Sequence, residues 1–157
     1  KRSTPLSVAV GAIPGALPLI IGYLAFEPSI SPMAWMLFGL QFLWQFPHFW
    51  AVAWLADEDY KKAGFYLLPS KNGEKDATTG LLSFVFCLLM VGNAGLGYWL
   101  GYVGFAATTG LILLNLWWAW KCWNLYKTCS REAARTQMFI SFAHLPLSLI
   151  VLLLDKI

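Results

Sequence analysis

The side chains best suited to chemistry lie in one stretch, residues 41–69, which reads QFLWQFPHFWAVAWLADEDYKKAGFYLLP. Its first half has an apolar helical pattern interrupted by Gln41, Gln45 and His48. On a continuous α-helix these three side chains and Asp59 fall within about 60° of one another. Polar side chains inside a bilayer are costly and normally face a protein interior or an aqueous cavity. The stripe of Gln41, Gln45, His48 and Asp59 therefore predicts the wall of a functional cavity.

Three consecutive acids follow the apolar half, Asp57, Glu58 and Asp59, with Lys61 and Lys62 just after them. Carboxylate oxygens suit Mg²⁺, which binds through one or two carboxylates plus substrate phosphates. The ammonium groups of the two lysines could share the charge of such a phosphate. The alternative is a solvated loop that only ends a membrane span. Segment 63–69 is apolar between two charged clusters, and it could lie at the membrane interface or cover the cavity as a lid.

His48 follows Pro47, and a proline frees backbone carbonyls close to this imidazole. A histidine there could carry a proton, serve as a ligand, or make a structural hydrogen bond; a functional role is favoured. His144 has fewer polar neighbours in its segment, so we expect a core histidine. Asn93 and Asn115 are expected to make hydrogen bonds between helices.

The composition is that of a membrane protein: of the 157 residues, 59% are hydrophobic and 12% are charged, against about 45–50% and about 25% in soluble domains. A bilayer span needs about 20 mostly apolar residues. We therefore predict an all-α, polytopic transmembrane helix bundle in a single domain. Its five spans are 5–24, 33–56, 78–100, 104–120 and 136–154.

Charge sets the expected orientation of this bundle. Ten of the eleven Lys and Arg residues fall before the first span or in the connections 57–77 and 121–135, and only Lys156 falls on the other side. The positive-inside rule then places the N-terminus and the acidic loop in the cytoplasm and the C-terminus outside. Because topology already explains the basic residues, no nucleic-acid partner is expected.

The run FLWQFPHFWAVAWL followed by EDYKKAGFYLLP resembles the protoheme IX farnesyltransferases (haem O synthases), which are UbiA-type intramembrane prenyltransferases. The opening KRSTPLSVAVGAIPGALPLIIGY is similar to the fifth helix of that family. The resemblance covers most of residues 1–80 and is weaker beyond them. Ser7 and Leu19 depart from the family pattern, so no role is carried over to either side chain.

This resemblance implies nine transmembrane helices and two acidic motifs on cytoplasmic loops, which hold Mg²⁺ and farnesyl diphosphate. Glu58, Asp59 and Tyr60 match the second motif, whereas Asp57 ranks below them as a metal ligand. The first motif, Asn-x-x-x-Asp-x-x-x-Asp, is absent and should lie in four preceding helices. We therefore expect this chain to be the C-terminal part of a longer protein, and to be inactive without the N-terminal half.

The implied reaction transfers a farnesyl group from farnesyl diphosphate to a vinyl group of protohaem IX, giving haem O, in the inner membrane of a bacterium. Mg²⁺ would neutralise the leaving diphosphate. A straight helix at about 1.5 Å per residue separates His48 from Asp59 by about 16 Å, so His48 should contact the acceptor rather than the diphosphate. The expected substrate-binding residues are Lys61, Lys62, Tyr60, Gln45, Gln41, Lys1 and Arg2.

Two other classes of function remain open on the residues alone. A membrane transporter or proton-conducting subunit would use the Gln41, Gln45, His48 and Asp59 stripe as its path, and would need neither diphosphate nor a divalent metal. A non-catalytic anchor or assembly subunit would tolerate apolar residues along the stripe. An upstream acidic motif in the full-length sequence would separate the prenyltransferase from the transporter.

Overall fold

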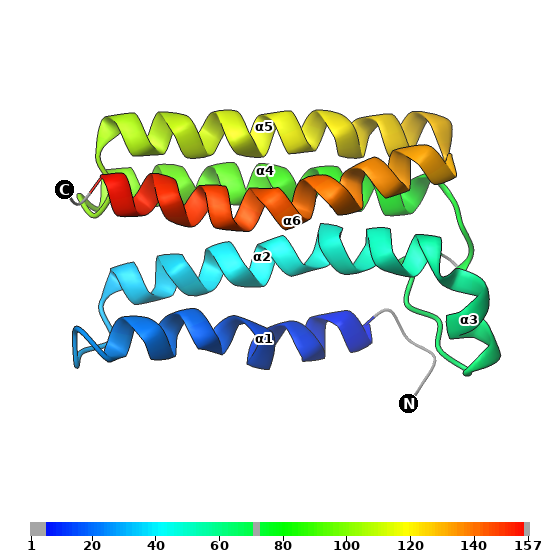
Figure 1. Cartoon of the computed structure of the whole chain (residues 1–157), viewed down its shortest axis with the longest axis horizontal. Coiled ribbons are helices and arrows are strands. Elements are labelled where there is room, and N and C mark those ends of the chain that lie inside the picture. Colours follow the sequence, from blue (N-terminus) through cyan, green and yellow to red (C-terminus); the bar gives the residue numbers. More distant parts are fainter. Residues whose placement is uncertain (1–5, 71–72, 156–157) are drawn as a thin grey trace.

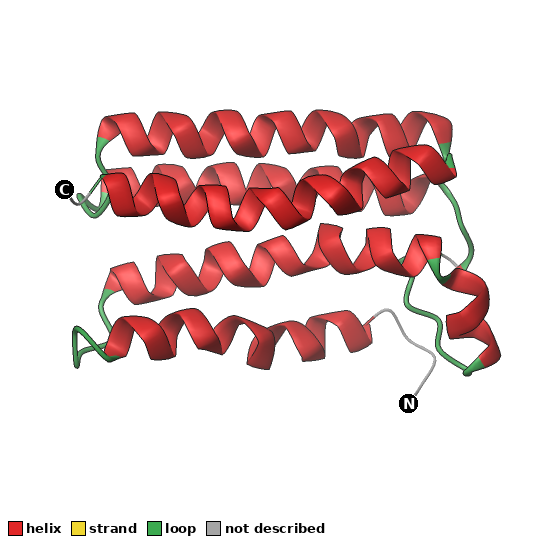
Figure 2. Ribbon diagram, in the orientation of Figure 1, coloured by secondary structure: helices red, strands yellow, loops and turns green. Residues whose placement is uncertain are grey.

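The fold is seen in a computed structural model that describes residues 6–70 and 73–155. Within those ranges the chain forms helices and contains no strand, as Figure 2 shows. The predicted all-α class is therefore confirmed. The helices are α1 (Leu6–Leu24), α2 (Pro32–Leu55), α3 (Asp57–Lys62), α4 (Ala77–Trp99), α5 (Phe105–Thr128) and α6 (Arg131–Leu154).

The long helices lie side by side with their axes nearly parallel, and α3 projects from one end of this bundle (Figure 1). Helix α2 has the central position, since it packs against α1, α4 and α6. Helix α5 packs against α4 and α6 on the far side from α1. The side chains of α2 therefore have three different neighbours, and their direction around the helix decides which one they contact.

Short polar side chains fix where the helices begin. Ser31 caps α2 by accepting from the backbone N–H of residue 34, and Pro32 occupies its first turn, a position where proline is favoured. Asp76 caps α4 and Ser130 caps α6 in the same way, as such residues do at helix N-termini. Asp155, just past α6, accepts from the backbone N–H of Gly104 at 2.6 Å and so joins the C-terminal end of α6 to the start of α5.

Helices α4 and α5 approach each other closely at Gly80. A Cβ atom there would lie only 2.6 Å from the Cα of Tyr126 and 2.8 Å from the carbonyl carbon of Leu125, both backbone atoms. Real Cβ atoms essentially never come that close to backbone. A residue without a side chain is therefore needed at this crossing.

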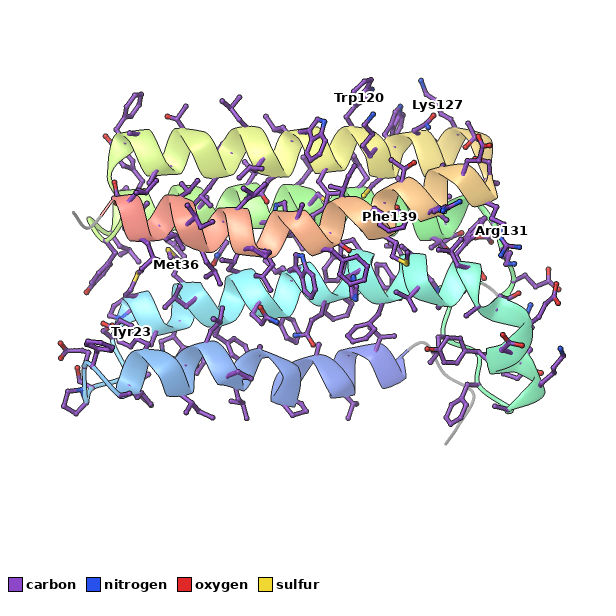
Figure 3. The ribbon with its side chains drawn as sticks, in the orientation of Figure 1. Tyr23, Met36, Trp120, Lys127, Arg131 and Phe139 are labelled. Carbon is purple, nitrogen blue, oxygen red and sulfur yellow. The ribbon has the colours of Figure 1, made fainter. Side chains whose placement is uncertain are left out.

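Helices α5 and α6 extend beyond the predicted membrane spans 104–120 and 136–154, whose limits in the bilayer stay a prediction. Helix α5 continues to Thr128 and α6 begins at Arg131, so the predicted connection 121–135 is almost entirely helical. The turn comes at Cys129, which adopts a left-handed conformation with φ 44°, and at the capping Ser130. Lysine and arginine are good helix formers. Residues 121–135 were assigned to a connection because they are charged, although charge does not end a helix. Figure 3 shows Lys127 and Arg131 at the end of the bundle that carries α3.

Two helices, Ala77–Trp99 and Arg131–Leu154, are long and apolar enough to cross a membrane by length and composition, and Val8–Leu24 forms a shorter apolar helix. Large apolar side chains also face outward along the bundle: Trp99 is 79% exposed and Val10 is 69% exposed. Apolar patches of this kind mark contact with lipid or with another protein surface.

Candidate active site

The helix that carries His48 does not continue to the acids. Helix α2 ends at Leu55, and α3 begins at Asp57 after the bend at Ala56, whose φ and ψ are −104° and 19°. Figure 1 shows α3 turning away from the axis of α2. The prediction that Asp59 extends the polar stripe of a straight helix is therefore wrong, and so is the basis of the 16 Å spacing. Acidic residues are favoured at a helix N-terminus, which explains a new helix beginning at three acids.

The three acids have different surroundings. Asp57 is buried, and its carboxylate lies 3.0 Å from the ammonium group of Lys61 and 3.9 Å from that of Lys75. Asp59 is exposed and lies 3.8 Å from the ammonium of an equally exposed Lys62. Glu58 is exposed as well. Asp57 thus ties α3 to the segment before α4, while the next two carboxylates face outward.

These carboxylates fit part of a Mg²⁺ site. No group of three or more His, Cys, Asp or Glu side chains that could hold a metal ion occurs among residues 6–70 and 73–155. Glu58 and Asp59 are nevertheless adjacent and exposed, and Mg²⁺ needs only one or two protein carboxylates when phosphates and waters supply its other ligands. Asp57, already paired with two ammonium groups, is the least available of the three.

An apolar cavity of about 310 Å³ is lined by residues of α1, α2, α3 and segment 63–69. Tyr60 of α3 lines it, together with Phe49 of α2 and with Val8 and Gly11 near the start of α1. Segment 63–69 contributes Phe65 and Leu67 to the lining of this cavity. Whether the segment acts as a lid or lies at the membrane interface stays a prediction. Gly73 packs closely against Tyr66 of this segment, since a Cβ at Gly73 would lie 2.9 Å from that of Tyr66.

Of the two glutamines of the predicted stripe, Gln45 has a defined partner in another helix. Gln45 is buried and donates to the carbonyl of Ala12 in α1 at 3.0 Å and to the carbonyl of Gln41 at 3.2 Å. Its amide occupies the space that a side chain would need at Gly15. The side-chain oxygen of Gln41 is buried and makes no hydrogen bond within the described part of the chain. Gln45 therefore joins α1 to α2.

His48 points toward a different helix. Its Nδ1 lies 2.7 Å from the hydroxyl oxygen of Ser141 in α6, and its ring stacks on Trp44 with centroids 4.6 Å apart. Because Gln45 contacts α1 and His48 contacts α6, the predicted stripe does not form one continuous polar path. This geometry removes the structural basis of the transporter interpretation.

Helix α6 carries a buried polar face that the sequence prediction missed. Gln137 donates to the carbonyl of Pro47 at 2.8 Å and to the hydroxyl of Ser83 at 3.0 Å. His144 lies 2.8 Å from the side-chain oxygen of Asn115, which confirms it as a core histidine. The signal was present as the spacing of four, three and four residues between Gln137, Ser141, His144 and Ser148, one face of a helix.

The remaining predicted residues are placed as follows. Lys61 is half-buried beside Asp57, and Lys62 is exposed. Asn93 donates to the carbonyl of Met36 across α4 and α2, as predicted. Lys1 and Arg2 lie outside the described residues.

Comparison with known proteins decides the family. The sequence profile of the UbiA prenyltransferase family matches residues 1–143. The chain belongs to the UbiA prenyltransferase family. The predicted family resemblance is thereby confirmed, and membership in this membrane family favours a membrane location over a soluble one.

Named relatives give a finer comparison within the UbiA family. The chain is 42% identical over its whole length to a protoheme IX farnesyltransferase of Cytophaga hutchinsonii and covers 54% of it. It is 40% identical to the protein of that name from Flavobacterium psychrophilum and 34% identical to that from Solibacter usitatus; in both cases 99% of the chain and 53% of the relative are covered. The chain thus spans about half the length of the curated relatives it matches. No solved structure matches it significantly.

Proposed function

We propose that the full-length protein containing this chain transfers a farnesyl group from farnesyl diphosphate to a vinyl group of protohaem IX, giving haem O. The observation that carries the proposal is similarity along essentially the whole chain, at 34–42% identity, to relatives named protoheme IX farnesyltransferase. Helix α3 carries two exposed carboxylates and also lines an apolar cavity through Tyr60, which suits a substrate with a charged head and a hydrocarbon tail.

Glu58 and Asp59 are the residues proposed to hold Mg²⁺ with the diphosphate. A bound Mg²⁺ would stabilise the negative charge that develops on the leaving diphosphate. Lys62 is exposed next to these carboxylates and can contribute a further positive charge to the diphosphate oxygens. Lys61 is already paired with Asp57, so its proposed part is to hold α3 in position.

The apolar cavity is proposed to exclude water from the reacting chain. Its lining of Phe49, Phe65 and Leu67 offers hydrocarbon and aromatic contacts. Breaking the bond between farnesyl and diphosphate leaves an allylic carbocation, which water would capture in an open site. His48 is proposed to contact the porphyrin acceptor, because its surroundings are aromatic rather than charged.

In the bilayer, α1, α2, α4, α5 and α6 are proposed as five of nine spans in a bacterial inner membrane, with the α3 end in the cytoplasm. The segment missing relative to the named relatives would supply the other acidic motif and the remaining spans. The basic residues at the α3 end support this orientation. The transporter alternative is not favoured by family membership.

The experiment that tests the proposal is a substrate-dependence assay on the purified full-length protein. Diphosphate release from farnesyl diphosphate should require both protohaem IX and Mg²⁺, and it should stop when EDTA removes the metal. Release that needs no porphyrin, or that proceeds unchanged in EDTA, would contradict it. Replacing farnesyl diphosphate by geranylgeranyl diphosphate in the same assay measures the preference for chain length.

A further inference from the structure

We propose that Ser141 and Trp44 hold His48 as the tautomer protonated on Nδ1, so that Nε2 offers its lone pair to the iron of the haem acceptor. The identity of the acceptor rests on the proposed function. The tautomer and the positioning role of the two residues rest on the hydrogen bonds between α2 and α6.

The tautomer follows from the single proton of the Ser141 hydroxyl. Its oxygen lies 2.5 Å from the carbonyl oxygen of Met138 and 2.7 Å from Nδ1 of His48. A carbonyl can only accept, so the serine proton must point to Met138. The serine oxygen then accepts from His48, and Nδ1 carries the proton. The other ring nitrogen of a neutral imidazole is consequently unprotonated.

Trp44 fixes the plane and the position of the same ring. It lies one helical turn before His48, and their rings stack with an interplanar angle of 13°. The indole N–H donates to the backbone carbonyl of Ser141 at 3.0 Å. Trp44 and His48 thus both bond to the same residue of α6, one to its backbone and one to its side chain. This double contact holds the imidazole at a fixed angle to α2.

Nε2 is the part of His48 left for a ligand. Nε2 makes no hydrogen bond within residues 6–70 and 73–155, and this nitrogen is not completely buried there. The edges of Phe49 and Phe142 flank the ring, at centroid distances of 5.3 and 5.2 Å. Both phenylalanines are about half exposed. His48 as a whole is only 9% exposed, so a ligand would reach Nε2 edge-on, past aromatic side chains that suit the face of a flat, apolar metalloporphyrin.

Ligation of the iron by His48 can be distinguished from simple packing of His48 against the porphyrin ring. A neutral imidazole nitrogen is a common haem ligand, and a ligating histidine normally donates its other N–H to a fixed acceptor. That acceptor orients the ring and raises its basicity, and its loss costs roughly 10- to 100-fold in metal affinity. The effect should appear with iron protohaem IX but not with metal-free protoporphyrin IX, because only the former has an axial coordination site.

The test measures binding of both porphyrins to the full-length protein in detergent, without farnesyl diphosphate. Ser141→Ala should weaken ferric protohaem IX about 10-fold and shift its Soret band, while protoporphyrin IX affinity changes less than about 2-fold. Ser141→Thr, which keeps the hydroxyl, should restore protohaem affinity. Ser148→Ala is the matched control, because it removes a buried hydroxyl of α6 that has no partner in the described chain.

Two results would overturn the proposal. If Ser141→Ala weakens both porphyrins equally, or neither, Nε2 does not ligate the iron. If ¹⁵N NMR of histidine-labelled protein finds Nδ1 of His48 unprotonated, the hydrogen-bond assignment is wrong. Failure of the proposed function looks different, because the wild-type protein would then bind neither porphyrin while NMR still showed the Nδ1–H tautomer.

Discussion

Replacing Asp57 by Asn should loosen α3, because this carboxylate holds the short helix against the rest of the chain. Its side chain is 12% exposed and lies 3.0 Å from the ammonium group of Lys61, whose side chain is 34% exposed. The longer contact with Lys75, at 3.9 Å, joins α3 to the segment that leads into α4. A six-residue helix has little stability of its own, so these contacts should decide its orientation.

The magnitude follows from burial and distance. Two unit charges 4 Å apart attract by about 4 kcal/mol at an effective dielectric constant near 20. Desolvation and side-chain ordering cancel much of this attraction, and the partial exposure of Lys61 reduces it further. We therefore expect a coupling energy of about 1–2 kcal/mol between Asp57 and Lys61. The exposed pair of Asp59 and Lys62 should couple by less than about 0.5 kcal/mol.

The assay is a pair of double-mutant cycles on the unfolding free energy of the full-length protein. One cycle combines Asp57→Asn with Lys61→Met, and the other combines Asp59→Asn with Lys62→Met. The two lysines are adjacent in the same helix, so each cycle controls for the other. Limited proteolysis between residues 57 and 76 reports local opening of this region. Mg²⁺-dependent turnover should also require several-fold more Mg²⁺ in Asp57→Asn. Equal coupling in the two cycles, with unchanged proteolysis, would refute the structural role of Asp57.

Three further predictions concern the site and its support. Asp59→Asn in the full-length protein should lower turnover about 100-fold, as loss of a charge-stabilising group does, and unchanged turnover with unchanged Mg²⁺ dependence would count against a metal role. Gly80→Ala should destabilise the protein by about 1–3 kcal/mol through overpacking, whereas Gly92→Ala, with open space around it, should not; equal melting temperatures would contradict this. The 157-residue chain alone should show no farnesyl transfer, and measurable product would mean that one acidic cluster is enough.

Apolar runs of about 20 residues predicted the long helices, because a segment inside a bilayer must satisfy its backbone hydrogen bonds internally. For the polar residues within those runs, we predicted hydrogen bonds between helices at Asn93 and Asn115 and a core position for His144. The sequence could not tell which neighbour each polar side chain would meet. Gln45 and His48 lie on one broad face of α2, yet one bonds to α1 and the other to α6. Which helix each of these side chains contacts depends on how the helices pack, and no short stretch of sequence specifies that packing.

Helix ends were the weakest part of the sequence prediction. The bend at Ala56 was missed because alanine and the following acids fit a continuing helix as well as a new N-terminus. The helical course of residues 121–135 was missed for the opposite reason, since charged residues were taken to end the membrane segment. Ser141 was overlooked as a partner of His48 because its place on the polar face of α6 does not reveal which side chain of α2 lies beside it.

The central claim is tested most directly by the mass of the porphyrin that the full-length protein produces. Purified protein is incubated with protohaem IX, farnesyl diphosphate and Mg²⁺, and the extracted porphyrins are separated and weighed by mass spectrometry. The account predicts a product heavier than protohaem IX by one farnesyl group plus one hydroxyl group, formed in the wild type and nearly lost in Asp59→Asn. Unmodified protohaem IX as the sole porphyrin, with a Cytophaga hutchinsonii relative active in the same assay, would contradict it.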